Sequence, residues 1–232
     1  MKGTIENRDV FLKNIARKLR REPLKNVPAP KWAHEPQWDV YKEYTKDQLV
    51  AVMKEASQSI HTKVYETDSG HLADVVNGAI DDYGGGSVVT TRDPRFAELG
   101  LDGVLAKHRA YTWNASDGRK NIDIAAKADI GVTVCDVMLA ESATAGLFND
   151  KDKARCVSLL PVTSIVIVPK SVIVPRITQA MEMVEKKARA GEAISTYINF
   201  ISGPSNSADI EMRLVVGVHG PVKVAYIVVS DR

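Results

Sequence analysis

Hydrophobic and polar positions first alternate with helical spacing near the start of the chain. Residues 5–21 place apolar side chains near one face of a helix and basic side chains largely on the other. The apolar face comprises Val10, Phe11, Ile15 and Leu19. This pattern predicts an amphipathic helix whose basic face meets solvent, an acidic partner or lipid headgroups, and a solvated face is the simplest interpretation.

A proline-rich segment follows the predicted helix. Pro23, Pro28, Pro30 and Pro36 interrupt regular structure, and several tryptophan and tyrosine side chains come after them at irregular spacing. The composition is that of a linker, but the aromatic residues indicate that it packs across the domain or against another subunit. We therefore expect residues 1–45 to form an N-terminal helical arm.

Helical and strand-like patterns alternate from Thr45 to the end of the chain. Thr45 or Asp47 can cap a helix, and Gly84–Gly86 is expected to stop another. Further helices are predicted at 72–83, 121–128 and 171–191, and strands at 61–67, 87–91, 110–114, 130–137, 157–160, 165–168, 194–201 and 222–229.

Several of these predicted strands are nearly continuous β-branched runs, which is typical of strands buried on both faces. The alternation predicts an α/β domain over residues 46–232, with a mainly parallel central sheet covered by helices on both faces.

Charge and length exclude several classes of protein. The chain has 232 residues and a formal net charge of +2, which gives no reason to expect nucleic-acid binding. The longest apolar run, around residues 165–168, is far shorter than the roughly 20 residues of a transmembrane helix. Charged residues interrupt the N-terminal stretch where a signal peptide would need an apolar run. We expect a cytoplasmic protein.

Cysteine and histidine positions argue against a resident metal or cluster. Cys135 and Cys156 are the two cysteines, and neither has a CxxC or Cys/His metal spacing. They are expected to be free buried thiols. An iron–sulfur cluster needs about four cysteines, so this chain alone should bind no cofactor of that kind, and a partner would have to supply any redox centre. The other histidines have no paired spacing for a metal: His34, His61, His71 and His108.

The first candidate for chemistry is the small-residue segment 140–146, which follows a predicted buried strand. Glu141 is followed by the hydroxyl residues Ser142 and Thr144. A carboxylate in such surroundings can act as a nucleophile, as a general base or as an acceptor that orients a substrate. The structural alternative is a loop glutamate that caps backbone amides.

A second candidate, residues 201–211, combines a strand end with glycine, hydroxyl and amide side chains. Its polar and glycine positions are Gly203, Ser205, Asn206, Ser207 and Asp209. Backbone N–H groups there could hold a carboxylate or phosphate, although no P-loop spacing is present. Turn formation alone would also explain the glycine and Pro204.

The third candidate is the turn at residues 218–221, before the last predicted strand. His219 has a pKa range suited to proton transfer, and Gly220 would let a ligand approach the backbone. A single histidine can equally make a local hydrogen bond. All three candidate loops could lie at one edge of the sheet.

Taken in order, these segments resemble the LUD-domain family. The resemblance rests on Ala128–Thr133, Ala140–Ser142, Ser158–Pro161, Ile201–Ser205, Ala208–Glu211 and Gly217–Pro221. It implies the fold class shared by glucosamine-6-phosphate isomerase, ribose-5-phosphate isomerase and CoA transferases. It also implies a non-redox subunit in the oxidation of L-lactate to pyruvate, with iron–sulfur clusters in partner proteins.

Carried over by position, the resemblance implies catalytic roles for Glu141 and His219. The substrate-binding positions would be Ser142, Thr144, Gly203, Ser205, Asn206, Ser207, Asp209 and Gly220. Members of the family commonly have glycine where this sequence has Ala143. If that glycine adopts a positive φ, alanine is strained there, whereas a purely spatial role would let alanine fit.

Three functions remain open at this point. The first is a subunit of a lactate-oxidising complex that binds a small anionic ligand. The second is a free-standing CoA-transferase-like or sugar-phosphate-isomerase-like enzyme that uses Glu141, which rests on fold analogy alone. The third is a structural protein whose arm holds a complex together. A homo-oligomer fits each of them.

Overall fold

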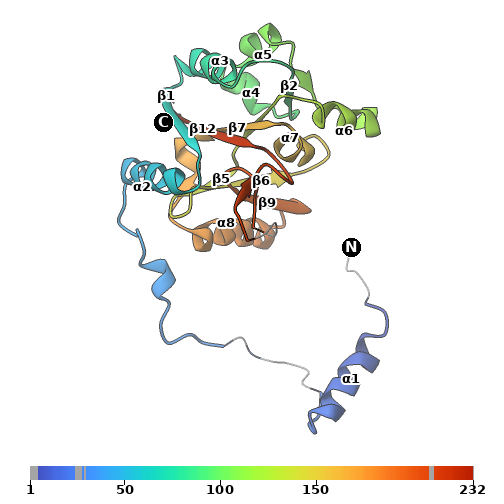
Figure 1. Cartoon of the computed structure of the whole chain (residues 1–232). Helices are drawn as coiled ribbons and strands as arrows, with labels where there is room; N and C mark the ends of the chain where they lie inside the picture. Colours follow the sequence, from blue (N-terminus) through green and yellow to red (C-terminus); the bar gives the residue numbers. More distant parts are fainter. Residues whose placement is uncertain (1–4, 24–27, 29, 209–211, 232) are drawn as a thin grey trace. The chain divides into compact units, whose positions relative to one another are not determined.

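A central sheet of six parallel strands organises the computed structural model, which describes residues 5–23, 28, 30–208 and 212–231 (Figure 1). The strands lie in the order β1 (Lys63–Asp68), β12 (Lys223–Ser230), β7 (Thr163–Pro169), β4 (Ile130–Val134), β2 (Val88–Thr90) and β3 (Tyr111–Thr112). Every neighbouring pair in this sheet is parallel. The predicted α/β class with a mainly parallel central sheet is confirmed.

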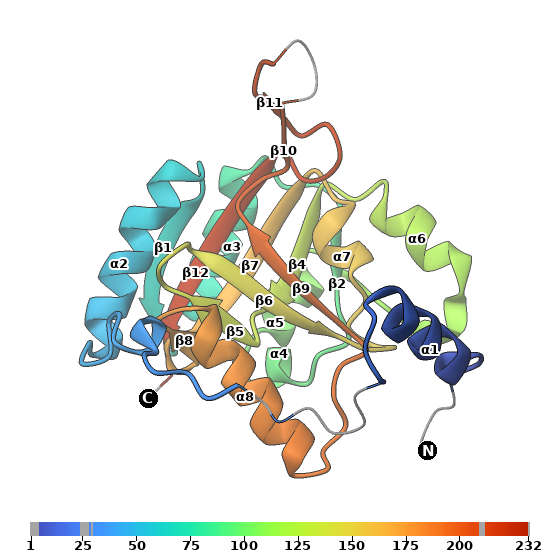
Figure 2. The same ribbon diagram turned by 90° about the horizontal axis from the view of Figure 1, so that it is seen from below.

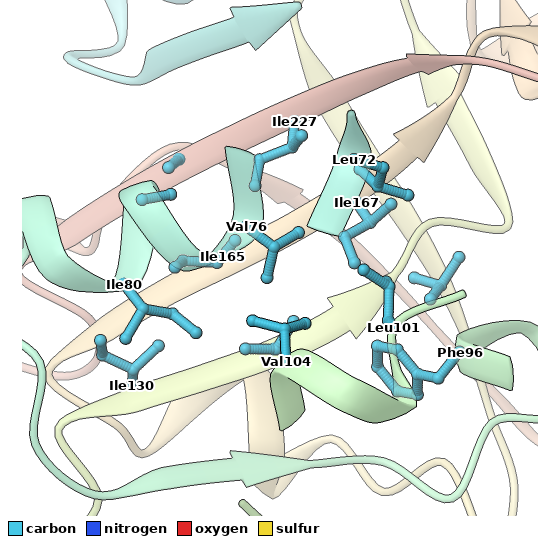
Figure 3. Close-up of a cluster of buried hydrophobic side chains, with 14 of the residues drawn as sticks. Leu72, Val76, Ile80, Phe96, Leu101, Val104, Ile130, Ile165, Ile167 and Ile227 are labelled. Atoms are coloured by element: carbon cyan, nitrogen blue, oxygen red, sulfur yellow. The ribbon is translucent and has the colours of Figure 1, made fainter. Parts of the chain in front are cut away.

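One face of the sheet packs against α3 (Leu72–Asp82), α4 (Arg95–Glu98) and α5 (Asp102–Lys107). Side chains from these helices meet isoleucines from the strands in a fully buried cluster (Figure 3). In the labelled view, Val76 and Ile80 of α3 lie over Ile130 and Ile165. Successive strand residues point to opposite faces of the sheet. Each continuous apolar strand therefore contributes side chains to a core on either face.

A second, four-stranded sheet covers part of the other face. Its order is β8 (Ile173–Val174), β5 (Val137–Leu139), β6 (Thr144–Asn149) and β9 (Tyr197–Ser202), and β6 is antiparallel to both β5 and β9. Its residues share a core with Tyr226 and with α2 (Lys46–Ser59), while α8 (Ile177–Arg189) packs on the outer side (Figure 2). The predicted strand 130–137 is therefore two strands, since the chain leaves the central sheet at Cys135 and Asp136.

Short elements complete the fold. Two are helices that flank the second face, α6 (Arg119–Ala125) and α7 (Cys156–Leu159). The 3-10 turns are Pro36–Trp38, Ala115–Asp117 and Lys170–Val172. A small projecting ribbon pairs β10 (Asn206–Ser207) with β11 (Val215–Val216), as Figure 2 shows.

The predicted strand at 157–160 is wrong, because this segment is the helix α7. Its backbone makes helical bonds such as Leu159 N–H to the Arg155 carbonyl at 3.1 Å. The helix lies so close to β4 that a Cβ at Gly131 would be 2.0 Å from the Val157 carbonyl oxygen. Four residues, three of them apolar, are too few to distinguish a short helix from a strand by periodicity. Gly131 leaves the room in which the helix approaches β4.

Helix boundaries follow local capping signals where these are strong. Thr45 caps α2 as predicted: its hydroxyl accepts the Gln48 N–H at 3.3 Å, and the Gln48 side chain accepts the Thr45 N–H at 2.8 Å. The helix predicted from residue 171 begins instead at Ile177, after a 3-10 turn and β8. Its apolar residues Ile177 and Met181 are 51% and 45% exposed, because α8 presents Ala180 to the domain.

The chain divides into two compact units, residues 1–35 and 36–232. In the first unit, the predicted amphipathic helix is present as α1 (Arg8–Lys18). Its apolar side chains Val10, Phe11 and Leu19 are exposed.

Candidate functional site

Strand pairing brings the first and second candidate loops together. Glu141 and Ser142 lie in the turn between β5 and β6, and β6 pairs with β9 so that Thr144 faces Ser202. The hydroxyl oxygens form a chain, 2.7 Å from Ser142 to Thr144 and 2.5 Å from Thr144 to Ser202. Thr144 is buried, so its hydroxyl is committed to this chain. The loop hydroxyls that the sequence proposed as ligands thus already satisfy one another.

Glu141 is held by a cation that the sequence analysis did not identify. Its carboxylate accepts a hydrogen bond from Arg176 Nε at 2.5 Å, and both side chains are partly exposed. Arg176 immediately precedes α8, and the Glu141 N–H bonds the Pro175 carbonyl at 3.1 Å. A carboxylate paired in this way is suited to orienting a partner, whereas nucleophilic attack would first require the ion pair to open.

Ala143 adopts the strained conformation that its sequence position suggested. Its φ is 47°, in the left-handed region that costs a non-glycine residue roughly 1–2 kcal/mol. Its side chain is fully buried in the core under the second sheet. The Glu141 turn therefore forms with an alanine at positive φ.

Tyr226 fastens the two loops to the central sheet, and the sequence analysis missed it. Its buried hydroxyl lies 2.9 Å from the Ala143 carbonyl oxygen and 3.4 Å from that of Ile201, and it accepts the Gly203 N–H at 3.3 Å. Burial raises the pKa of this phenol above its ordinary value, so it remains a neutral donor. The only sequence signal was a hydroxyl within the apolar run 222–229.

The third candidate loop joins the second one through Ser205. The Ser205 N–H bonds the Pro221 carbonyl at 2.9 Å, and the Gly217 N–H bonds the Ser205 carbonyl at 2.8 Å. A Cβ at Gly220 would lie 3.2 Å from the Ser205 Cβ, so close backbone approach is what this glycine provides.

The structure brings together only some of the site residues that the sequence predicted. Asn206 and Ser207 form β10, Asp209 lies outside the described residues, and His219 is exposed on its turn. Within the described part of the chain, no hydrogen bond or ion pair joins Glu141 to His219. The contacts instead run from one loop to the next.

The second and third candidate loops lie at the amino edge of the central sheet, where its strands begin. A Cβ at Gly203 would be 2.5 Å from the carbonyl oxygen of Ile60, just before β1. The Val222 N–H, just before β12, bonds the Val162 carbonyl at 2.8 Å, just before β7. Ligands of open α/β sheets favour the opposite, carboxyl edge.

The two cysteines differ in their surroundings. Both are free, with Cys135 buried and Cys156 half-buried. The Cys135 thiol donates to the Val137 carbonyl at 2.9 Å, and burial raises its pKa to about 12. In the described ranges there is no group of three or more His, Cys, Asp or Glu side chains that could hold a metal ion.

The Tyr226 hydroxyl offers a direct test of how the loops are held. Tyr226→Phe keeps the ring but leaves the buried Gly203 N–H and Ala143 carbonyl without their partner, so we expect a loss of about 1–3 kcal/mol in the free energy of unfolding, measured by urea denaturation. Tyr44→Phe, at an exposed tyrosine, should change it by less than about 0.5 kcal/mol. Equal stability of the two variants would refute this role.

Fold and site together define an α/β protein whose parallel sheet carries a second, mixed sheet and a Glu-containing turn fastened by a buried tyrosine. The sequence model of the LUD domain matches residues 50–229, and the chain belongs to this family.

Relatives extend over the whole chain. The lactate utilization protein C of Bacillus licheniformis is 50% identical over 99% of each chain. Those of Geobacillus thermodenitrificans and Bacillus subtilis are each 48% identical, over 100% of this chain and 99% of theirs. A crystal structure of a DUF162 family protein from Deinococcus radiodurans matches with a TM-score of 0.56 and 18% identity, over 80% of this chain and 99% of that one, which shows the fold.

In the residues that the structure describes, no helix has the length and apolar character needed to cross a bilayer.

Proposed function

We propose that this protein is a subunit for lactate utilisation that acts with iron–sulfur partner proteins in the oxidation of L-lactate to pyruvate. The observation that carries the proposal is similarity over the full length to proteins named lactate utilization protein C, at 48% and 50% identity. A match from end to end includes the N-terminal arm as well as the LUD domain.

The chemistry of the reaction fits a division of labour. Conversion of L-lactate to pyruvate releases two electrons and two protons, and the electrons need an acceptor. The buried Cys135 thiol is no redox centre, so in this proposal an iron–sulfur centre of a partner accepts the electrons. This chain would bind a small anionic ligand and contribute no redox step of its own.

The pairing of Glu141 with Arg176 favours this proposal over the free-standing enzyme. A CoA-transferase-like mechanism needs the carboxylate as a nucleophile, whereas here a guanidinium holds it.

Complementation tests the proposed function. A Bacillus subtilis strain that lacks its own lactate utilization protein C, and that is first shown to have lost growth on L-lactate, would receive this chain. We expect growth on L-lactate to return, while growth on glucose is the same with and without the chain. A strain that accumulates the folded protein and still fails on L-lactate would contradict the proposal.

A further inference from the structure

The carboxyl edge of the central sheet contains a place where ligands of α/β proteins commonly bind. β2 and β4 are neighbours in the central sheet. The next strand of this sheet after β2 is β3, which lies on one side of the pair, and the next after β4 is β7, which lies on the other. Adjacent strands whose connections leave in opposite directions form a topological switch point, where the loops part and open a crevice. None of the loops proposed from the sequence lies there.

Two buried hydroxyls meet at this switch point without partners. Thr91 directly follows β2 and Thr133 lies on β4, each one residue beyond the pair Thr90 and Val132, and they are 5% and 4% exposed. Each has an Oγ1 atom with no hydrogen-bond partner among the described residues. Both line one cavity of about 10 Å³, which has room for roughly one oxygen atom of a water or a ligand. Buried hydroxyls are normally paired, so two at one cavity point to an occupant.

Among the charged groups around the cavity, the carboxylate oxygens already accept hydrogen bonds, whereas an ammonium group can still donate. Arg95 donates to Asp93 at 2.9 Å through Nε and reaches Asp136 at 3.0 Å through Nη2. The other oxygen of Asp136 accepts the Phe148 N–H at 2.7 Å. Lys153 also lines the cavity, and its ammonium makes only a long contact, 3.5 Å to Asp136, within the described chain.

Those contacts select the chemistry of the occupant. The two aspartates and the two cations balance in formal charge. The groups that can still form hydrogen bonds are the two threonine hydroxyls and the Lys153 ammonium. All three can donate, so the complementary group is an oxygen acceptor with a negative charge.

We propose that the β2–β4 switch point binds the carboxylate of a small organic acid, with one oxygen between Thr91 and Thr133 and the other at Lys153. The acid is of the 2-hydroxy or 2-oxo class and of lactate's size, an assignment that rests on the proposed function. The Lys153 side chain is partly exposed, so it can contact an acid that approaches from solvent.

Titration of the purified full-length protein, followed by NMR chemical shifts, tests the site. L-lactate or pyruvate should bind with a Kd in the range of roughly 1 mM, as expected for so small a ligand, and uncharged lactamide about tenfold more weakly. Inorganic phosphate should also bind more weakly than the acids, because its tetrahedral group is bulkier than a planar carboxylate.

Thr133→Val separates binding from structure, because valine keeps the shape and removes only the hydroxyl. We expect acid binding to weaken about tenfold, while the thermal unfolding midpoint stays the same or rises, since no internal hydrogen bond is lost. Thr91→Val should behave alike. Thr90→Val is the matched control: Thr90 is 1% exposed on the opposite face of β2, and its replacement should leave acid binding unchanged.

Two results would overturn the site. One is undiminished acid binding by both Thr91→Val and Thr133→Val, and the other is the absence of acid binding by the parent protein. If complementation on L-lactate succeeds while no acid binds, the site is wrong and the proposed function stands. If acids bind at this site and complementation fails, the proposed function is wrong.

Discussion

Arg95→Met is expected to lower the free energy of unfolding by about 3–5 kcal/mol, because it leaves a buried carboxylate without its cation. Asp93 has a nearly fully buried side chain and accepts four bonds from three nitrogens of Arg95, among them 2.9 Å from Nε and 3.0 Å from the backbone N–H. The guanidinium also donates to the Cys135 carbonyl at 2.9 Å, where the chain leaves the central sheet. Chemical denaturation in urea would measure the loss.

An exposed ion pair provides the control for this substitution. Arg189 contacts Glu185 at 2.6 Å on α8, but both side chains are largely in solvent. Arg189→Met should therefore change stability by less than about 0.5 kcal/mol. A similar loss in both variants would mean that the burial of Asp93 does not set the cost.

The pH dependence of the two proteins should differ in sign. Burial opposes the charged form of Asp93, but the bonds and charge of Arg95 outweigh it, so the pKa of Asp93 lies below its ordinary value. The parent protein thus keeps this contribution at neutral pH and loses it as the pH falls through that lowered pKa. In Arg95→Met the guanidinium is lost, and only the backbone N–H bond of residue 95 and the charge of Lys153 still offset burial. The pKa of Asp93 therefore rises, and the folded variant gains stability relative to its unfolded state on acidification. The stability difference should narrow between about pH 7 and pH 4; a constant difference would contradict this account.

Local sequence signals were sufficient to predict several strands and helix ends. The continuous apolar run 165–168 predicted the centre of β7, and Thr45, one of two candidate caps, predicted the start of α2. Gly84–Gly86 was expected to stop a helix, and all three residues have positive φ after α3. Each of these depends on neighbours within a few residues along the chain.

Contacts between distant segments explain what the sequence left out. The break between β4 and β5 lies where Arg95 binds the Cys135 carbonyl from 40 residues away, so the run 130–137 gives no sign of it. The Tyr226 bond to Ala143 and the ion pair of Glu141 with Arg176 are equally remote in sequence. The residues of the β2–β4 switch point look ordinary along the chain, because what distinguishes Thr91 and Thr133 is the lack of a partner after folding.

Gly203→Ala is expected to cost about 2–5 kcal/mol in the free energy of unfolding, because two penalties act at one position. The φ of Gly203 is +65°, where an alanine is strained by roughly 1–2 kcal/mol. The added Cβ would also lie 2.5 Å from the Ile60 carbonyl oxygen and 3.1 Å from its Cβ, and overpacking of this kind costs about 1–3 kcal/mol. Neither neighbour can move freely, since Gly203 is tied to Tyr226 and Ile60 leads into β1.

Gly191→Ala isolates the first penalty, because Gly191 has a φ of +75° and nothing lies within 4 Å of the added Cβ. It should cost only about 1 kcal/mol in urea denaturation, so the difference between the two variants measures the close contact at Ile60. Equal losses would show that the loop at Gly203 yields to the added methyl group.

Complementation on L-lactate then distinguishes the two edges of the sheet. If the amino-edge loops carry the function, a strain with folded Gly203→Ala protein fails to grow on L-lactate, while a strain with Thr133→Val grows. If the carboxyl-edge site carries it, the strain with Gly203→Ala grows and the strain with Thr133→Val does not.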